Sequence, residues 1–174
     1  LLTSTRNDRE EVSGTLIFFK NNQRYQLDNI GIKVSGNSSF VLPESPDDPY
    51  VQANFTLDFD EFVDEQALSG ISKVKLKRFH NDSTYVHEPL SNQIMQNFDV
   101  WTVHSSTYVK LNITVGDRGT AYYGIYRLNE SVNRHEYLDK RFGPDNDGGF
   151  LWQGNYKDWG PAHFSRIDEN WGGV

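Results

Sequence analysis

Hydrophobic and polar residues alternate over several short segments of the chain, which is typical of strands that are buried on one face. Residues 24–27 follow this pattern, and residues 11–19 contain the apolar run Thr15–Phe19 on the other side of the polar turn 20–23; together they predict a hairpin. Further strands are predicted on the same grounds at residues 29–34, 54–59 and 71–79.

The predicted strand 71–79 separates its charged residues from its apolar ones. Val74 and Leu76 alternate with Lys73, Lys75 and Lys77. Because successive side chains of a strand point to opposite faces of the sheet, we expect the lysines to face solvent.

Two longer β-rich segments, 107–115 and 121–128, are joined by the sequence Gly-Asp-Arg-Gly and predict a second hairpin. We expect these two segments to be central strands. One helix is predicted to begin at Glu88 and Pro89, because proline is tolerated in the first helical turn, and to end near Asn97. Its buried stripe is expected to be Leu90, Ile94 and Phe98.

A second helix is predicted at residues 133–141, and a short strand follows at 150–153. The sum is seven or eight strands, mostly in antiparallel hairpins, with two short helices. This combination predicts the α+β class. A length of 174 residues and an aromatic content of 14% are enough for one ordered domain with its own core.

The net charge of −7 and the sequence pI near 5.1 argue against binding to nucleic acid, whose phosphates would be repelled. A nucleotide can still bind to an acidic protein through a local basic pocket. The chain has no cysteine and no apolar run long enough to span a membrane. Its histidines lack the spacing of a zinc site, so no metal ligand is predicted.

Asn-x-Ser/Thr sequons are more frequent than chance predicts, and they favour a secreted or cell-surface protein that carries glycans. The candidate glycosylation sites are Asn37, Asn54, Asn81, Asn112 and Asn129. Near the end of the chain, Trp152, Trp159 and Trp171 are candidates for binding a protein or glycan partner, because exposed indole rings stack on sugars and anchor protein interfaces.

Three sequence elements resemble those of the spore coat protein H (CotH) family of atypical protein kinases. The first consists of Gly31, Gly36, Ser38 and Ser39, and the second of Asp82, Glu88 and Leu90. The third comprises the glycine, aromatic, acidic and aliphatic positions Gly124, Tyr126, Glu130, Val132, Tyr137 and Leu138.

This resemblance implies a fold like the small, nucleotide-binding lobe of a kinase, the cofactors ATP and Mg, and phosphoryl transfer to a protein substrate. By the same resemblance, Gly36, Asn37, Ser38, Ser39 and Glu130 would contact the nucleotide, with the bend after Val34 and the acid Glu130 flanking one cleft. Residues 1–153 would form the lobe, and 154–174 would begin a following Trp/Gly-rich segment that is truncated.

The chain departs from the family pattern at positions that usually carry positive charge. Ser35 and His87 stand where relatives have arginine, and Val51 and Gln52 stand in place of a basic pair. Lys33 or Lys73 could take over the phosphate contact.

The acidic motifs that complete the family's active site do not occur before Val174. The alternative to a kinase is therefore a non-catalytic, secreted or surface-exposed module that binds a protein or a glycan.

Overall fold

The computed structural model describes residues 10–36, 39–43, 51–132, 135–144, 152–155 and 163–166. These residues belong to two compact units, Leu1–Ser131 and Val132–Val174. Among the described residues, the first unit has a six-stranded sheet and one α-helix, and the second has one α-helix and a two-stranded sheet.

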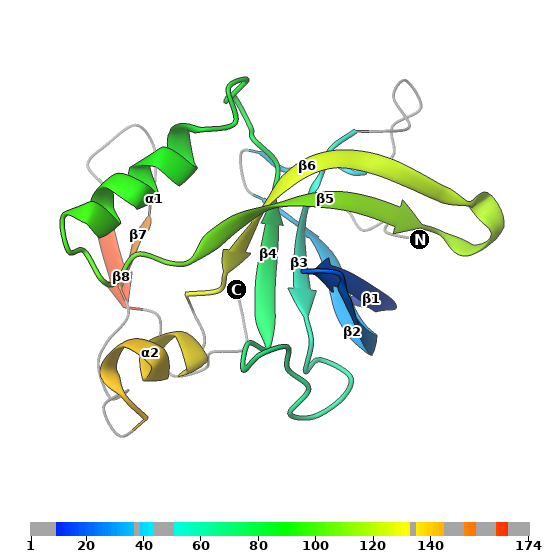
Figure 1. Ribbon diagram of the computed structural model, residues 1–174, viewed down its shortest axis with the longest axis horizontal. Helices are drawn as coiled ribbons and strands as arrows, with labels where there is room; N and C mark the ends of the chain where they lie inside the picture. Colours follow the sequence, from blue (N-terminus) through cyan, green and yellow to red (C-terminus); the bar gives the residue numbers. More distant parts are fainter. Residues whose placement is uncertain are drawn as a thin grey trace. The chain divides into compact units, whose positions relative to one another are not determined.

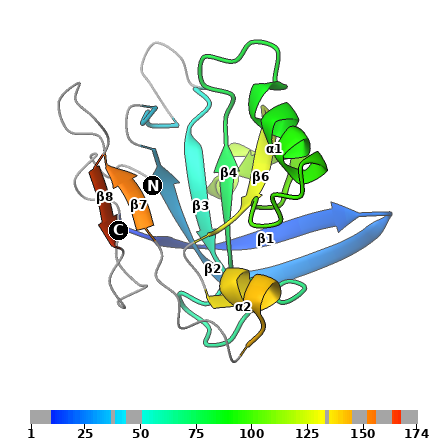
Figure 2. The same ribbon diagram turned by 90° about the vertical axis from the view of Figure 1, so that its left-hand side faces the viewer.

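The sheet of the first unit is antiparallel throughout and has the strand order β1-β2-β3-β4-β6-β5. Figures 1 and 2 show that it is strongly twisted and curled, with β3 and β4 in its middle. The α+β class predicted from the sequence is confirmed. The strands of this sheet are β1 (Val12–Lys20), β2 (Gln23–Ser35), β3 (Asn54–Asp58), β4 (Lys73–Lys77), β5 (Ser106–Thr114) and β6 (Thr120–Glu130).

The hairpin predicted at the start of the chain is β1–β2. Its two turn residues, Asn21 and Asn22, have φ values of 51° and 62°, as a tight hairpin turn requires, and asparagine adopts this conformation more readily than most residues. The prediction of a separate strand at residues 29–34 is wrong, because these residues are part of β2. A bulge at Asn29, with φ 54°, interrupts the pairing with β1 and explains the break in the hydrophobic alternation.

One face of the sheet forms the hydrophobic core. Ile30 and Val34 of β2 pack with Phe55 of β3 and Leu76 of β4, and all four side chains are buried. Burial of each such side chain contributes about 1.5–3 kcal/mol to folding. These residues are the apolar halves of the alternating patterns, so the sequence alone places them in the core.

The hairpin β5–β6 lies at the edge of the sheet rather than at its centre. Strand β6 pairs with β4 and with β5, but β5 has β6 as its one neighbour in the six-stranded sheet. The prediction of two central strands is wrong for β5. In Figure 1 the far end of this ribbon extends beyond the other strands, and length and β-propensity alone do not distinguish such a projecting ribbon from a buried pair.

Helix α1 (His87–Asn97) begins and ends close to the predicted positions. Its predicted buried stripe is wrong, because Leu90, Ile94 and Phe98 are 53%, 47% and 78% exposed. The helix instead turns a polar residue inward: Asn92 is buried, and its amide group lies within hydrogen-bonding distance of Ser106. Helical periodicity alone predicts which side chains share a face, and it does not predict which face is covered.

The start of α1 is fixed by Asp82, a residue of the second family element. Its carboxylate accepts hydrogen bonds from the hydroxyl of Thr84 at 2.6 Å and from the backbone N–H of His87 at 2.9 Å. The hydroxyl of Thr84, followed by the backbone N–H groups, holds the pKa of Asp82 below its ordinary value. The acid thus satisfies donors at the helix N-terminus, where negative charge is favourable.

Replacing Asp82 by asparagine should therefore destabilise the protein in a pH-dependent way. A carboxylate with a lowered pKa adds stability above its ordinary pKa, and this stability disappears as the pH falls through the lowered value. Thermal unfolding of wild type and Asp82→Asn should differ at pH 6 and converge at strongly acidic pH. A constant difference at every pH would contradict the role of the charge.

The second unit contains α2 (His135–Phe142), β7 (Trp152–Asn155) and β8 (His163–Arg166), with β7 and β8 paired antiparallel. The guanidinium group of Arg141 lies 3.8 Å from the ring centre of Tyr137, one helical turn earlier. The predicted helix and the predicted strand at 150–153 correspond to α2 and β7, whereas β8 was not predicted. Among the described residues, neither α-helix has the length and apolarity needed to cross a membrane.

Candidate functional site

The face of the sheet opposite the hydrophobic core carries a dense group of polar side chains. Residues directly paired across neighbouring strands project to the same side of a sheet. Lys33 of β2, Thr56 of β3, Lys75 of β4 and Asn129 of β6 are paired in this way and form one continuous row. We call this row and its neighbours on the same side the lysine face, which consists of Lys33, Thr56, Asp58, Lys73, Lys75, Lys77, Arg127 and Asn129.

The lysine face is half-buried rather than open to solvent. Lys73, Lys75 and Lys77 are all of intermediate exposure, and Thr56 and Asn129 are buried. The expectation that the lysines of β4 form a solvated surface is therefore wrong. Alternation correctly separates them from the core, but it cannot show that their own side is partly covered.

Two of the lysines are neutralised by carboxylates. The ammonium group of Lys33 lies 2.5 Å from Glu11, and that of Lys73 forms an ion pair with Asp58, whose side chain is 1% exposed. Both lysines had been candidates for a phosphate contact on sequence grounds. Their charges are already matched, which makes them less suitable for this purpose than an unpaired lysine.

Lys75 has no carboxylate partner in the described part of the chain. Burial lowers its pKa, and the neighbouring charges of Lys77, Lys73 and Lys33 lower it further. An ammonium group in this position is repelled by its neighbours and partly deprived of water. An anion placed beside it would relieve both costs.

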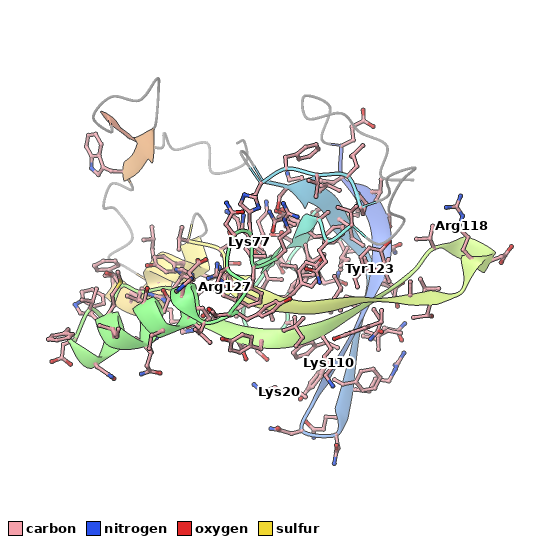
Figure 3. The ribbon with its side chains drawn as sticks, turned by 90° about the horizontal axis from the view of Figure 1, so that it is seen from above. Lys20, Lys77, Lys110, Arg118, Tyr123 and Arg127 are labelled. Atoms are coloured by element: carbon pink, nitrogen blue, oxygen red, sulfur yellow. The ribbon has the colours of Figure 1, made fainter. Side chains whose placement is uncertain are left out.

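Arg127 connects the lysine face to helix α1. Its guanidinium group, 5% exposed, forms an ion pair with Glu88 in the first turn of α1. Lys77 is its register partner on β4, and Figure 3 shows the two residues close together.

Three carboxylates form a cluster that includes Asp58 of the lysine face. Oxygen atoms of Glu11, Asp58 and Glu61 lie within 4.8 Å of one another. However, Glu11 and Asp58 already pair with Lys33 and Lys73, so two of the three possible ligands are engaged by ammonium groups. Burial and the charges of Glu11 and Asp58 raise the pKa of Glu61. The cluster thus balances the lysines and does not fit a divalent cation.

The glycine-serine turn predicted to contact the nucleotide is only partly described, since Asn37 and Ser38 lie outside the described residues. Gly36 has φ 123°, which favours glycine. The hydroxyl of Ser39 accepts a hydrogen bond from the amide group of Asn54 at 3.0 Å. These contacts attach the turn to the start of β3.

Arg78 brings a positive charge to this turn. Its guanidinium group lies 3.5 Å from the carbonyl oxygen of Ser39, and its backbone N–H donates to the side chain of Asn54 at 2.8 Å. Arg78 thus brings to the turn a charge like that of the arginine that the resemblance implies in place of Ser35. Sequence reasoning missed Arg78, because the contact joins the turn to the residue that follows β4.

Glu130 lies away from the turn. Its carboxylate accepts a hydrogen bond from the backbone N–H of Ser105 at 3.0 Å. The register aligns Glu130 with Ile32, three residues before Ser35, and three strand spacings separate β6 from β2. The separation is about 10 Å along the strands and about 14 Å across them. The bend and the acid thus lie at separate places on the sheet, and their contact with one nucleotide stays a prediction.

Gln52, which stands at a basic position of the family, has a structural role. Its side-chain amide donates to the carbonyl oxygen of Tyr123 at 2.7 Å. Tyr123 is the extra residue of a bulge in β6, where the pairing with β5 shifts by one residue. The glutamine thus satisfies a carbonyl group that the irregular strand leaves available.

The predicted glycosylation sites differ in exposure. Asn54 and Asn129 are 2% and 6% exposed, which disfavours a glycan on either, whereas Asn81 and Asn112 are exposed. Asn37 lies outside the described residues. Occupancy of the exposed sequons stays a prediction.

The three tryptophans predicted to bind a partner are described only in part. Trp152 is 57% exposed, and Trp159 and Trp171 lie outside the described residues. Partner binding through these rings stays a prediction.

Comparison with known proteins identifies the family. The family model described as CotH kinase protein matches residues 32–170, which is most of the chain. The chain therefore belongs to the CotH kinase protein family. Comparisons with curated proteins and with solved structures gave no match. The matched span extends across both compact units, so the predicted lobe boundary at residue 153 stays a prediction.

Proposed function

We propose that the chain is a nucleotide-binding part of a CotH-type kinase and that the phosphates of ATP bind at the lysine face. The observation that carries this proposal is Lys75, a half-buried lysine without a carboxylate partner among the described residues, with Lys73 and Lys77 beside it on the same face of β4. The charges of Lys77, Lys73 and Lys33 oppose the positive charge of Lys75, and a bound anion would relieve this repulsion. Family membership supports a phosphorylated nucleotide as that anion.

The residues of the lysine face fit a triphosphate but not a separate magnesium site. Lysine and arginine supply charge-assisted hydrogen bonds to phosphate oxygens. Magnesium commonly binds through phosphate oxygens and water with one or two carboxylates, and when bound it would neutralise part of the phosphate charge. The carboxylates of Glu11 and Asp58 are already paired, so we assign no protein ligand to the ion from this part of the chain.

Isothermal titration calorimetry with Mg-ATP tests the proposal directly. We expect saturable binding that weakens as salt is added, because part of the attraction is between charges. Adenosine, which has no phosphate, is the matched control and should bind far more weakly. Absence of any heat at millimolar Mg-ATP, or equal binding of adenosine, would contradict the proposal.

A second candidate function, binding of a protein partner, is favoured by the apolar surface of α1. Leu90, Ile94 and Phe98 lie on one side of the helix, and Trp101 follows it; all four are about half exposed or more. Exposed apolar patches that are larger than scattered single residues often mark interaction sites. The surface-module alternative would use this face to bind an apolar surface of another protein.

Substitutions on α1 test whether its apolar surface binds a protein partner. Labelled protein carrying Ile94→Asp and Phe98→Asp should lose binding to cells, whereas Gln93→Asp on the same helix should keep it. Binding of Mg-ATP should be unchanged in both proteins. Cell binding that survives the double substitution but is lost in Trp152→Ala would instead support an aromatic platform for glycans.

A further inference from the structure

The row Lys33–Thr56–Lys75–Asn129 contains one positive charge that the described protein does not balance. We infer that Lys75 is the residue that contacts the phosphate group and that the row around it is an oxyanion site. This inference deepens the proposed function, on which it rests for the identity of the nucleotide. The capacity of the site to bind an anion does not depend on the nucleotide, because it follows from a half-buried cation among polar side chains.

The geometry of the row suits a phosphate-sized anion. Lys33 and Lys75 are separated by Thr56 on the intervening strand, so their Cα atoms are about 10 Å apart. Lysine side chains are long and flexible enough to converge on one group across this distance. Lys77 lies two residues along the same strand and on the same side.

Asn129 supplies a second, independent indication that a polar ligand binds at this row. Its side chain is 6% exposed, and its carboxamide oxygen has no hydrogen-bond partner among the described residues. Buried polar groups are rarely left in this state. With the amide turned the other way, Asn129 would offer an N–H donor next to Lys75, as a phosphate requires.

The charges around the row explain why Lys75 is better suited than its neighbours. Lys33 is paired with Glu11, Lys73 with Asp58, and Arg127 with Glu88. Each of these would have to leave a carboxylate before contacting a phosphate. Lys75 needs no such exchange, and its burial makes the interaction with an anion stronger than it would be in open water.

Binding of inorganic tripolyphosphate and of Mg-ATP to wild type and to Lys75→Met tests this inference. Loss of one charge-assisted contact should weaken both ligands about tenfold or more. Lys20→Met is the matched control, because Lys20 is exposed at the end of β1, opposite Gln23 in the hairpin. It should leave both affinities unchanged. Lys75→Arg keeps the charge and should retain most of the binding.

The outcomes separate the two proposals. Tripolyphosphate binding that depends on Lys75, together with no binding of Mg-ATP, would support the oxyanion site and overturn the nucleotide function. Mg-ATP binding that is equal in wild type and Lys75→Met would overturn the oxyanion site and leave the nucleotide function standing. If Lys75→Met and Lys20→Met weaken binding equally, the effect is one of net charge and the inference is wrong.

Discussion

Replacing Asp58 by alanine is expected to lower the free energy of unfolding by about 3–5 kcal/mol, the usual cost of breaking a buried ion pair. Asp58 is 1% exposed and pairs with Lys73, whose side chain is 13% exposed. Without the carboxylate, the ammonium group of Lys73 would stay largely buried beside Lys75. The loss should be measured by chemical denaturation at neutral pH.

A double substitution provides the control for this experiment. Asp58→Leu combined with Lys73→Met removes both charges and replaces them with apolar groups of similar size. Buried pairs replaced in this way often cost little stability. We therefore expect the double variant to be more stable than Asp58→Ala. If Asp58→Ala alone changes stability by less than 1 kcal/mol, the pair is not buried as described.

Gly124→Ala is expected to destabilise the protein by about 2–3 kcal/mol, from backbone strain and from displacement of the Gln52 amide from its hydrogen bond. Gly124 has φ 109°, a conformation that residues with a Cβ atom rarely adopt. An added Cβ would also collide with the side-chain amide of Gln52, which holds the bulge carbonyl of Tyr123. Thermal and denaturant unfolding measure the loss.

Gly119→Ala separates the loss caused by backbone strain from the loss caused by the contact with Gln52. Gly119 also has a positive φ, 80°, but no atom lies within 4 Å of an added Cβ. This variant should show the strain alone and a smaller loss. The double variant Gln52→Ala and Gly124→Ala should lose less stability than the sum of the two single variants, because each single variant already loses the hydrogen bond to Tyr123. Equal losses for Gly119→Ala and Gly124→Ala would mean that the contact with Gln52 is unimportant.

The fold could be predicted wherever the sequence contains a local signal. Alternation identified β3 and β4, and the turn asparagines identified the first hairpin. The placement of β5 at the sheet edge and the exposed side of α1 could not be predicted in this way. Both depend on which elements meet in space, and neither propensity nor periodicity contains that information.

The candidate site shows the same division between local and long-range information. The pattern of β4 correctly put Lys73, Lys75 and Lys77 on one face, and the lysine substitutes considered for the phosphate contact were Lys33 and Lys73. Lys33 of β2 pairs with Glu11, which precedes β1, and Lys73 of β4 pairs with Asp58 of β3. Both pairs thus join residues that are far apart in the sequence. The unpaired state of Lys75 is visible only when all these partners are known.

Two-dimensional amide NMR of isotope-labelled protein during a titration with Mg-ATP tests most directly whether the lysine face binds the nucleotide. We expect the largest changes in chemical shift at Lys33, Thr56, Lys75 and Asn129, which form one row across four strands. If these amides stayed unchanged at saturating nucleotide while those of Gly36 or Glu130 shifted, the nucleotide would bind elsewhere and the proposed site would be wrong.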